Sequence, residues 1–281
     1  MKEILNLVRF PNLLLIVLCQ ALVQACLLAS GINWSKALEP GFIMLTVSTV
    51  LVAAGGYIIN DYYDVKIDAI NKPERMVVGK KVRRRHAMTV HMMVSAVGVL
   101  LGFWLSWQVG LINLGAVLLL WGYSDQLKKM LLIGNVAIAL LGASMLLVVA
   151  VYADKLNKIT LGYALFAFLI SLIREIVKDM EDVKGDASFG CRTLPIVAGL
   201  RNTKFVLYPL LALFMVFVLV VIFHNRTGSW FDSYMALLVL VPSLWFIVRL
   251  VRSDKKKDFT FLSNLGKFLM LTGILSMLLI G

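Results

Sequence analysis

Aspartates occur in the same arrangement at two places in this chain. Residues 61–68 read DYYDVKID and residues 179–186 read DMEDVKGD, so five of the eight positions are identical. Each segment carries three aspartates at positions i, i+3 and i+7, which on a helix lie within an arc of about 60°. Two carboxylates about 4 Å apart repel by ~4 kcal/mol at an effective dielectric constant near 20. A stripe of three is therefore stable only when it is solvated, partly protonated or bridged by a cation.

The repeated aspartates predict a divalent-metal site. Magnesium prefers carboxylate oxygens and keeps waters and substrate phosphates among its ligands. Two facing stripes could hold roughly two or three magnesium ions around a diphosphate, and the metals would stabilise that group as it leaves a substrate. Solvated charge on a surface loop is the ordinary reading of a lone aspartate. It does not explain a repeated motif in a chain with only 16 acidic residues.

The rest of the chain has the composition of a membrane protein. Of its 281 residues, 60% are hydrophobic and 16% are charged, and the mean hydropathy is +0.87. These values predict an all-α polytopic membrane protein, a bundle of nine transmembrane helices. The expected spans are 11–30, 41–59, 87–106, 109–123, 131–152, 159–177, 204–223, 233–251 and 262–280. The fourth is short for a span of about 20 residues, so it is either strongly tilted or extends to Trp107.

The net charge of +12 is compatible with nucleic-acid binding, but its distribution indicates membrane topology instead. If the N-terminus is cytoplasmic, nine spans leave few basic residues outside, namely Lys36, Lys155, Lys158 and Arg226. This asymmetry follows the positive-inside rule. It predicts an integral protein of the cytoplasmic membrane of a prokaryote, with membrane lipids but no nucleic acid as partners. The long connecting segments, 60–86 and 178–203, would then face the cytoplasm.

The spacing of the two motifs predicts an internal repeat. Four predicted spans lie between them, so both motifs emerge on the same side of the membrane. The chain divides into two four-helix units and a ninth helix, and each motif follows the second helix of its unit. A parallel repeat of this kind brings equivalent segments to one pocket. We expect each carboxylate stripe to lie on a helical extension of the preceding span, within a single domain covering residues 1–281.

The residues around both motifs resemble the two signatures of the UbiA superfamily of intramembrane prenyltransferases. The first signature is matched by Asn60, Asp61, Asp64 and Asp68, followed by Asn71-Lys-Pro-Glu-Arg75. The second is matched by Lys178-Asp179-x-x-Asp182-x-x-Gly185-Asp186, with Gly190, Thr193-Leu-Pro195 and Gly199 after it. Tyr123-Ser-x-x-Leu-Lys128 and Gly134-Asn135 also match. The resemblance therefore extends over essentially the whole chain.

This resemblance implies an enzyme that uses Mg²⁺ to transfer an isoprenyl group from an isoprenyl diphosphate, with release of pyrophosphate. The implied catalytic residues are Asp64, Asp68, Asp182 and Asp186. The implied metal ligands are these four and Asn60, with Asp61 and Asp179 in supporting positions. The residues expected at the diphosphate are Arg75, Tyr123, Lys128, Lys129, Lys178 and Arg192. The implied acceptor is lipophilic, either a glycerol-phosphate ether lipid precursor or a quinone-type aromatic.

Two other classes of membrane protein are alternatives. CDP-alcohol phosphotransferases also use paired aspartates, but their D-G-x-x-A-R core does not occur in this sequence. Cation-coupled transporters can have repeats and carboxylates, yet their ligands usually lie near the bilayer midplane on broken helices. The aspartates of this chain lie past the ends of the predicted spans, which favours the prenyltransferase.

Overall fold

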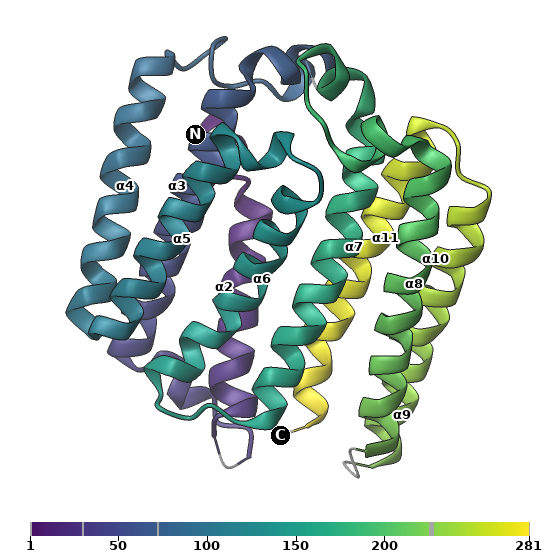
Figure 1. Cartoon of the computed structure of the whole chain (residues 1–281). Coiled ribbons are helices and arrows are strands. Elements are labelled where there is room, and N and C mark those ends of the chain that lie inside the picture. The colour runs from purple at the N-terminus through teal and green to yellow at the C-terminus, as the bar shows by residue number, and fades with distance from the viewer. Residues whose placement is uncertain (1, 30, 72, 225–227, 281) are drawn as a thin grey trace.

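The computed structural model describes residues 2–29, 31–71, 73–224 and 228–280 (Figure 1). The long helices are α2 (Phe10–Leu22), α3 (Pro40–Asn71), α4 (Arg84–Leu105), α5 (Trp107–Asp125), α6 (Ile133–Tyr152), α7 (Lys158–Ser188), α8 (Leu194–His224), α10 (Val241–Val251) and α11 (Lys256–Leu275). The shorter elements are α1 (Lys2–Leu7), η1 (Val23–Leu27), η2 (Trp34–Leu38), η3 (Pro73–Arg75), η4 (Leu127–Lys129), α9 (Ser229–Met235), η5 (Ala236–Leu240) and η6 (Ser276–Leu279).

Within these ranges, nine helical segments are long and apolar enough to cross a membrane. Each predicted span falls on one of them, which confirms the all-α membrane fold. The fourth segment, α5, does begin at Trp107, where the Ser106 hydroxyl caps the helix by accepting a hydrogen bond from the Val109 amide at 3.2 Å. Arg226, which the charge distribution assigns to the outer side, lies outside the described residues.

Helices α3 and α7 are much longer than the spans predicted for them. They contain 32 and 31 residues, about 48 Å at 1.5 Å per residue, whereas the hydrocarbon core is about 30 Å thick. Both aspartate motifs lie on these extensions, as expected. The prediction of long connecting segments at 60–86 and 178–203 is wrong in extent, because the helices continue to Asn71 and Ser188, and α8 starts again at Leu194.

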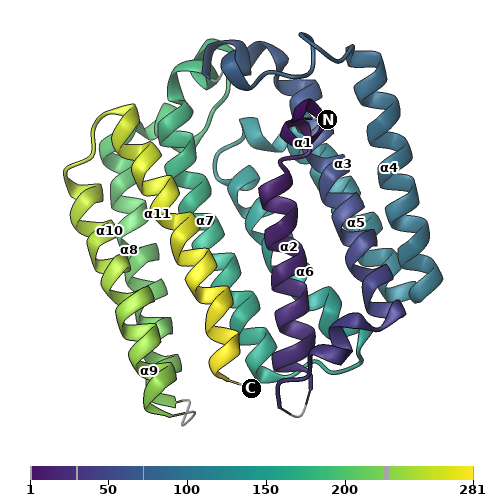
Figure 2. The same cartoon turned by 180° about the vertical axis from the view of Figure 1, so that it is seen from behind.

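The helices run side by side, with α1 and the last described residues at opposite ends of the bundle (Figures 1 and 2). Helices α2 and α6 lie between a group formed by α3, α4 and α5 and a group formed by α7, α8, α10 and α11 (Figure 1). The two motif-bearing helices, α3 and α7, also contact each other directly. The extended ends of both helices therefore belong to one site.

Close packing fixes the direction of each motif-bearing helix. A Cβ atom at Gly98 of α4 would lie 2.9 Å from the Ser48 carbonyl oxygen of α3, so the two backbones touch there. Asn113 of α5 packs against the same contact between α3 and α4. Its side-chain amide donates to the Ser48 hydroxyl and to the Gly98 carbonyl oxygen, each at 3.2 Å. On the other side, α7 is held by a core that includes Phe166, Phe214, Phe246 and Phe259.

Candidate functional site

Both carboxylate stripes begin at the same height along their helices. Asp61 follows Pro40 by 21 residues, and Asp179 follows Lys158 by 21. At 1.5 Å per residue, each motif starts about 30 Å from the beginning of its helix, which is the thickness of the hydrocarbon core. The carboxylates thus lie at a membrane boundary, where charge can be hydrated while the apolar bundle lies below.

The end of α3 is joined to the second motif through Asn71. The Asn71 side-chain amide donates to the Asp182 carbonyl oxygen at 3.2 Å and lies 3.5 Å from Asp186 Oδ1. Its side-chain oxygen accepts a hydrogen bond from the Gly185 backbone amide at 3.0 Å. A Cβ atom at Gly185 would lie 2.4 Å from the Asn71 amide group, so glycine is required for this contact. Asn71 therefore determines how the two motifs meet.

In the first motif, Asp64 makes contacts through both of its carboxylate oxygens. Its Oδ2 accepts a hydrogen bond from the Asn60 amide at 2.7 Å, and its Oδ1 lies 2.5 Å from Lys128 Nζ. Only 14% of the Asp64 side chain and 11% of the Lys128 side chain are exposed. Asp68 is half-buried one turn further along α3. Asp64 thus contacts both Asn60 and Lys128 directly.

The first aspartate of each motif is bound to the first helix of its own unit. Arg9, just before α2, forms an ion pair of 3.2 Å with Asp61. Asn135, in the first turn of α6, donates to Asp179 Oδ2 at 2.8 Å. Equivalent aspartates therefore contact equivalent places in the two units. These bonds use oxygens of Asp61 and Asp179 within the protein, consistent with the supporting position implied for both.

The two motifs lie near each other. Asp182 is buried and Asp186 is half-buried on α7. The Tyr123 hydroxyl, from α5, lies near both Asp179 of one stripe and Asp64 of the other. Burial, reinforced by the nearby Asp186 carboxylate, raises the pKa of the Cys191 thiol to about 11. Asp64 also contributes to that shift, so Cys191 lies near both stripes.

The remaining basic residues predicted at the diphosphate lie in different surroundings. Lys178 Nζ is 3.4 Å from Glu175 Oε2, one turn below the second motif. The side chains of Lys129 and Arg192 are exposed, although the Arg192 amide donates to the Lys129 carbonyl oxygen at 2.8 Å and so joins their two segments. The backbone of Arg75 belongs to η3, but its side chain lies outside the described part of the chain.

Arg174 and Glu175, which lie outside both motifs, also belong to this region. Arg174 Nη1 donates to Glu175 Oε1 at 2.6 Å, and only 7% of the Glu175 side chain is exposed. Glu175 precedes Asp179, Asp182 and Asp186 at helical spacing, so it continues the second stripe toward the membrane interior. The sequence could have pointed to Arg174 and Glu175, because both lie inside the predicted span 159–177 and ionisable residues within a span are costly and usually functional.

The oxygen donors of the site fit magnesium. Within the described ranges, no three or more His, Cys, Asp or Glu side chains are gathered closely enough to hold an ion by themselves. Magnesium is usually bound through one or two carboxylates, with waters and substrate phosphates as the other ligands. Asn60 and Asp64 from α3, and Asp182 and Asp186 from α7, offer such donors at the ends of two neighbouring helices.

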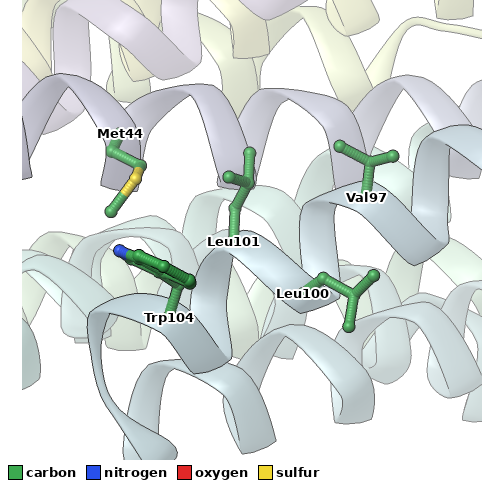
Figure 3. Close-up of a pocket in the computed structure, with 5 residues that line it drawn as sticks. All are labelled: Met44, Val97, Leu100, Leu101 and Trp104. Atoms are coloured by element: carbon green, nitrogen blue, oxygen red, sulfur yellow. The ribbon is translucent and has the colours of Figure 1, made fainter.

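Two cavities lie away from these carboxylates. A crevice of about 250 Å³ between α3 and α4 is lined by Met44, Val97, Leu100, Leu101 and Trp104 (Figure 3). The side chains of Leu100 and Trp104 are exposed and apolar, as on a helix surface that faces lipid. A second cavity of about 220 Å³ lies near Lys158 and His224, at the opposite end of α7 from the aspartates.

Comparison with known proteins is consistent with this geometry. The chain is 41% identical to the digeranylgeranylglyceryl phosphate synthase of Methanothermobacter thermautotrophicus over 57% of each chain. It is 36% identical to the synthase of the same name from Ignicoccus hospitalis, over 71% of this chain and 65% of the relative. The chain thus covers less than two thirds of the length of these two relatives.

The fold is similar to that of solved membrane proteins. A UbiA homolog from Archaeoglobus fulgidus bound to GPP and Mg²⁺ superposes with a TM-score of 0.67 and 16% identity, covering 98% of this chain and 99% of that one. At this identity the likeness concerns the fold. The sequence profile of the UbiA prenyltransferase family matches residues 16–271, which includes both aspartate motifs and all the helices that carry them. The chain therefore belongs to the UbiA prenyltransferase family.

Proposed function

We propose that this chain is a magnesium-dependent intramembrane prenyltransferase, which transfers an isoprenyl group from an isoprenyl diphosphate to a lipophilic acceptor. The observation that carries the proposal is the junction of two carboxylate stripes at a membrane boundary, joined through Asn71, above an apolar helix bundle. The polar end can bind a diphosphate while the bundle receives the isoprenyl chain. Membership of the UbiA family and the names of the archaeal relatives support the same function.

The catalytic roles follow from the contacts. Asp64, Asp68, Asp182 and Asp186, with Asn60, would hold magnesium directly or through water, while Asp61 and Asp179 would support them. When bound, magnesium would neutralise the diphosphate and favour its departure. Among the predicted diphosphate ligands whose side chains the structure describes, Lys128 is the best placed, because its ammonium already contacts Asp64. Tyr123, Arg75, Lys129, Lys178 and Arg192 would be further contacts of the diphosphate.

The surrounding helices would keep water away from the reaction. In the transfer, the bond between the allylic carbon and the diphosphate oxygen breaks, and that carbon bonds to the acceptor oxygen. Pyrophosphate and the proton of the acceptor hydroxyl are released. Water would capture an allylic cation, so a site at the edge of an apolar bundle protects the reacting carbon. The buried lower part of α7, with Phe166 and Ile173, supplies such a wall.

The acceptor that we propose is a glycerol-phosphate ether lipid. The relatives with 41% and 36% identity are both named digeranylgeranylglyceryl phosphate synthase. A name of this kind requires a second isoprenyl group to be added to a glyceryl phosphate that already carries one. A quinone-type aromatic is the other acceptor class implied by the family resemblance, and the relatives favour the glyceryl phosphate.

We also propose that residues 1–281 form one prenyltransferase domain in the cytoplasmic membrane of a prokaryote. The N-terminus and both motifs would face the cytoplasm. The support is the positive-inside distribution of Lys and Arg and the archaeal origin of the relatives. Since α1 and the extended ends of α3 and α7 lie at the same end of the bundle, one orientation accounts for all three (Figures 1 and 2).

The function is tested with purified protein in lipid vesicles. Geranylgeranyl diphosphate and a mono-alkylated glyceryl phosphate are supplied with Mg²⁺, and pyrophosphate release and the dialkylated product are measured. We expect both products in equal amounts and neither after EDTA treatment, with recovery on adding Mg²⁺. Transfer that persists in EDTA would contradict the metal role. Absence of transfer to every glyceryl phosphate and aromatic acceptor would overturn the proposed function.

A further inference from the structure

A charged pair on α7 lies just below the second aspartate motif. Arg174 precedes Asp182 by eight residues, about 12 Å along the helix toward the membrane interior. Its Nη1 donates to Glu175 Oε1 at 2.6 Å, and the side chains of Arg174 and Glu175 are 19% and 7% exposed. Its aliphatic stem lies against α11, where a Cβ atom at Gly266 would be 3.4 Å from Arg174 Cγ. The guanidinium is therefore held in a buried, defined position.

The Nε of this guanidinium is fully buried and has no hydrogen-bond partner among the residues that the structure describes. The hydrogen bond that the side chain makes to Glu175 uses Nη1, on the other side of the group. Leaving a buried N–H unsatisfied is costly, so such a group calls for an explanation. The edge formed by Nε and Nη2 matches the bidentate geometry of a phosphate or carboxylate.

The charge around the pair favours an anion. Lys178 Nζ lies 3.4 Å from Glu175 Oε2, and the Arg9 guanidinium also interacts electrostatically with Glu175. Three cations thus surround one carboxylate, although Arg9 also pairs with Asp61 and Lys178 also interacts with Asp179. An anionic ligand at Arg174 would balance this excess. A second carboxylate or phosphate group is therefore expected here, apart from the diphosphate at the aspartates.

The position suits the acceptor. Its hydroxyl must reach the reacting carbon directly below the diphosphate, on the side of the apolar bundle. A glyceryl phosphate carries its own phosphate only a few bonds from that hydroxyl. Arg174 and Glu175 lie one to two helical turns below Asp179 and Asp182, about 6–12 Å away. This is the depth at which a phosphate attached to the acceptor would lie.

We propose that Arg174 binds the phosphate monoester of the acceptor through its Nε and Nη2 edge, and that Glu175 is a positioning residue that holds the guanidinium in place. The inference rests on the proposed prenyl transfer and specifies which residue selects a phosphorylated acceptor. The diphosphate of the prenyl donor is bound separately, at the aspartates and Lys128. Arg174 therefore adds no binding affinity for a phosphate-free analogue of the acceptor.

The test separates the two substrates kinetically. Arg174→Gln and Arg174→Lys are assayed in vesicles, with an alkylglyceryl phosphate varied at saturating geranylgeranyl diphosphate, and then the reverse. We expect KM for the alkylglyceryl phosphate to rise about 10- to 100-fold in Arg174→Gln and less in Arg174→Lys, which keeps the charge but loses the fork. KM for geranylgeranyl diphosphate should change less than about twofold. Arg252→Gln, at an exposed arginine, is the matched control.

A binding measurement makes the result independent of turnover. Calorimetric titration of the purified protein with the alkylglyceryl phosphate and with the phosphate-free alkylglycerol should show a preference for the phosphate that Arg174→Gln abolishes. Thermal unfolding shows whether Arg174→Gln has merely misfolded. In that case, the phosphate preference of Arg174→Lys decides the assignment. An equal rise in both KM values, or an unchanged phosphate preference in either variant, would overturn the assignment. If wild-type protein transfers no prenyl group at all, the proposed function fails, while the titration still decides the role of Arg174.

Discussion

The backbone amide of Gly185 donates a hydrogen bond to the side-chain oxygen of Asn71 at 3.0 Å, and this contact joins the end of α3 to the end of α7. The two residues are 114 positions apart in the sequence. Asn71 follows the first aspartate motif and Gly185 lies within the second, so the bond sets the distance between the stripes. Lys256, at the start of α11, adds to the junction by donating to the Asn71 carbonyl oxygen at 3.0 Å.

Replacing Gly185 by alanine should force the two motifs apart. The new Cβ would lie 2.4 Å from the Asn71 side chain, and overpacking of this kind typically costs ~1–3 kcal/mol of stability. We expect a lower Tm and a large loss of prenyl transfer. Asn71→Ala removes the clashing group, so Gly185→Ala should cost less in that background. Additive effects in the double variant would contradict the proposed junction.

Removing either central aspartate should abolish transfer without preventing membrane insertion. We expect Asp64→Ala and Asp182→Ala each to lower the rate by roughly 10²–10³-fold, because charge on the departing diphosphate would lose its stabilisation. Pyrophosphate release by protein quantified in vesicles provides the measurement. Glu39→Gln, which breaks an exposed ion pair with Lys36 far from the motifs, is the control. Near-normal turnover in either aspartate variant would refute the site.

Lys128 and Lys129 are adjacent, and the structure separates their roles. Lys128 is bound to Asp64 and is largely buried, whereas the Lys129 side chain is exposed. We expect Lys128→Gln to raise KM for the prenyl diphosphate by about 10- to 100-fold and Lys129→Gln to change it only slightly. Steady-state kinetics at fixed acceptor concentration measure both. Equal effects would mean that the contact with Asp64 is not what positions the phosphate ligand.

Cys191 offers a chemical probe of the mouth of the site. Its thiol pKa of about 11 means that little thiolate exists at neutral pH. Alkylation by N-ethylmaleimide in EDTA should therefore be slow, with a rate that rises about tenfold per pH unit between pH 7 and 10. Mass spectrometry of Cys19→Ala/Cys26→Ala protein follows the reaction, and Cys191→Ser in that background is the blank. A rate that levels off near pH 8.5 would contradict the buried environment.

Much of the fold could be predicted from the sequence, because apolar run length and membrane thickness are directly related. The nine spans and the shared side of the two motifs follow from that relation. The continuation of α3 to Asn71 is harder to predict, since its polar last turns resemble a loop in hydropathy. What stabilises those turns is tertiary contact, above all between Asn71 and Gly185, and hydropathy does not record it.

The candidate site could likewise be predicted from the sequence only in part. The repeated spacing of Asp64 and Asp68 with Asp182 and Asp186 is visible in one sequence, since helical geometry places them on stripes. The contacts of Asp61 with Arg9 and of Asp179 with Asn135 depend on which helices become neighbours. Arg174 and Glu175 carry no motif, so only their position inside a span could have drawn attention to them.

Because α3 and α7 are unbroken, the thickness of the bilayer determines how deeply the carboxylates of the site lie. Both helices start at the opposite face and carry their first motif residue about 30 Å later, with no flexible segment between. In a thicker bilayer the carboxylates would sink toward the acyl chains and lose hydration. In a thinner one they would rise and let water reach the reacting carbon. Turnover should therefore pass through an optimum as the acyl chains of the host vesicle are lengthened.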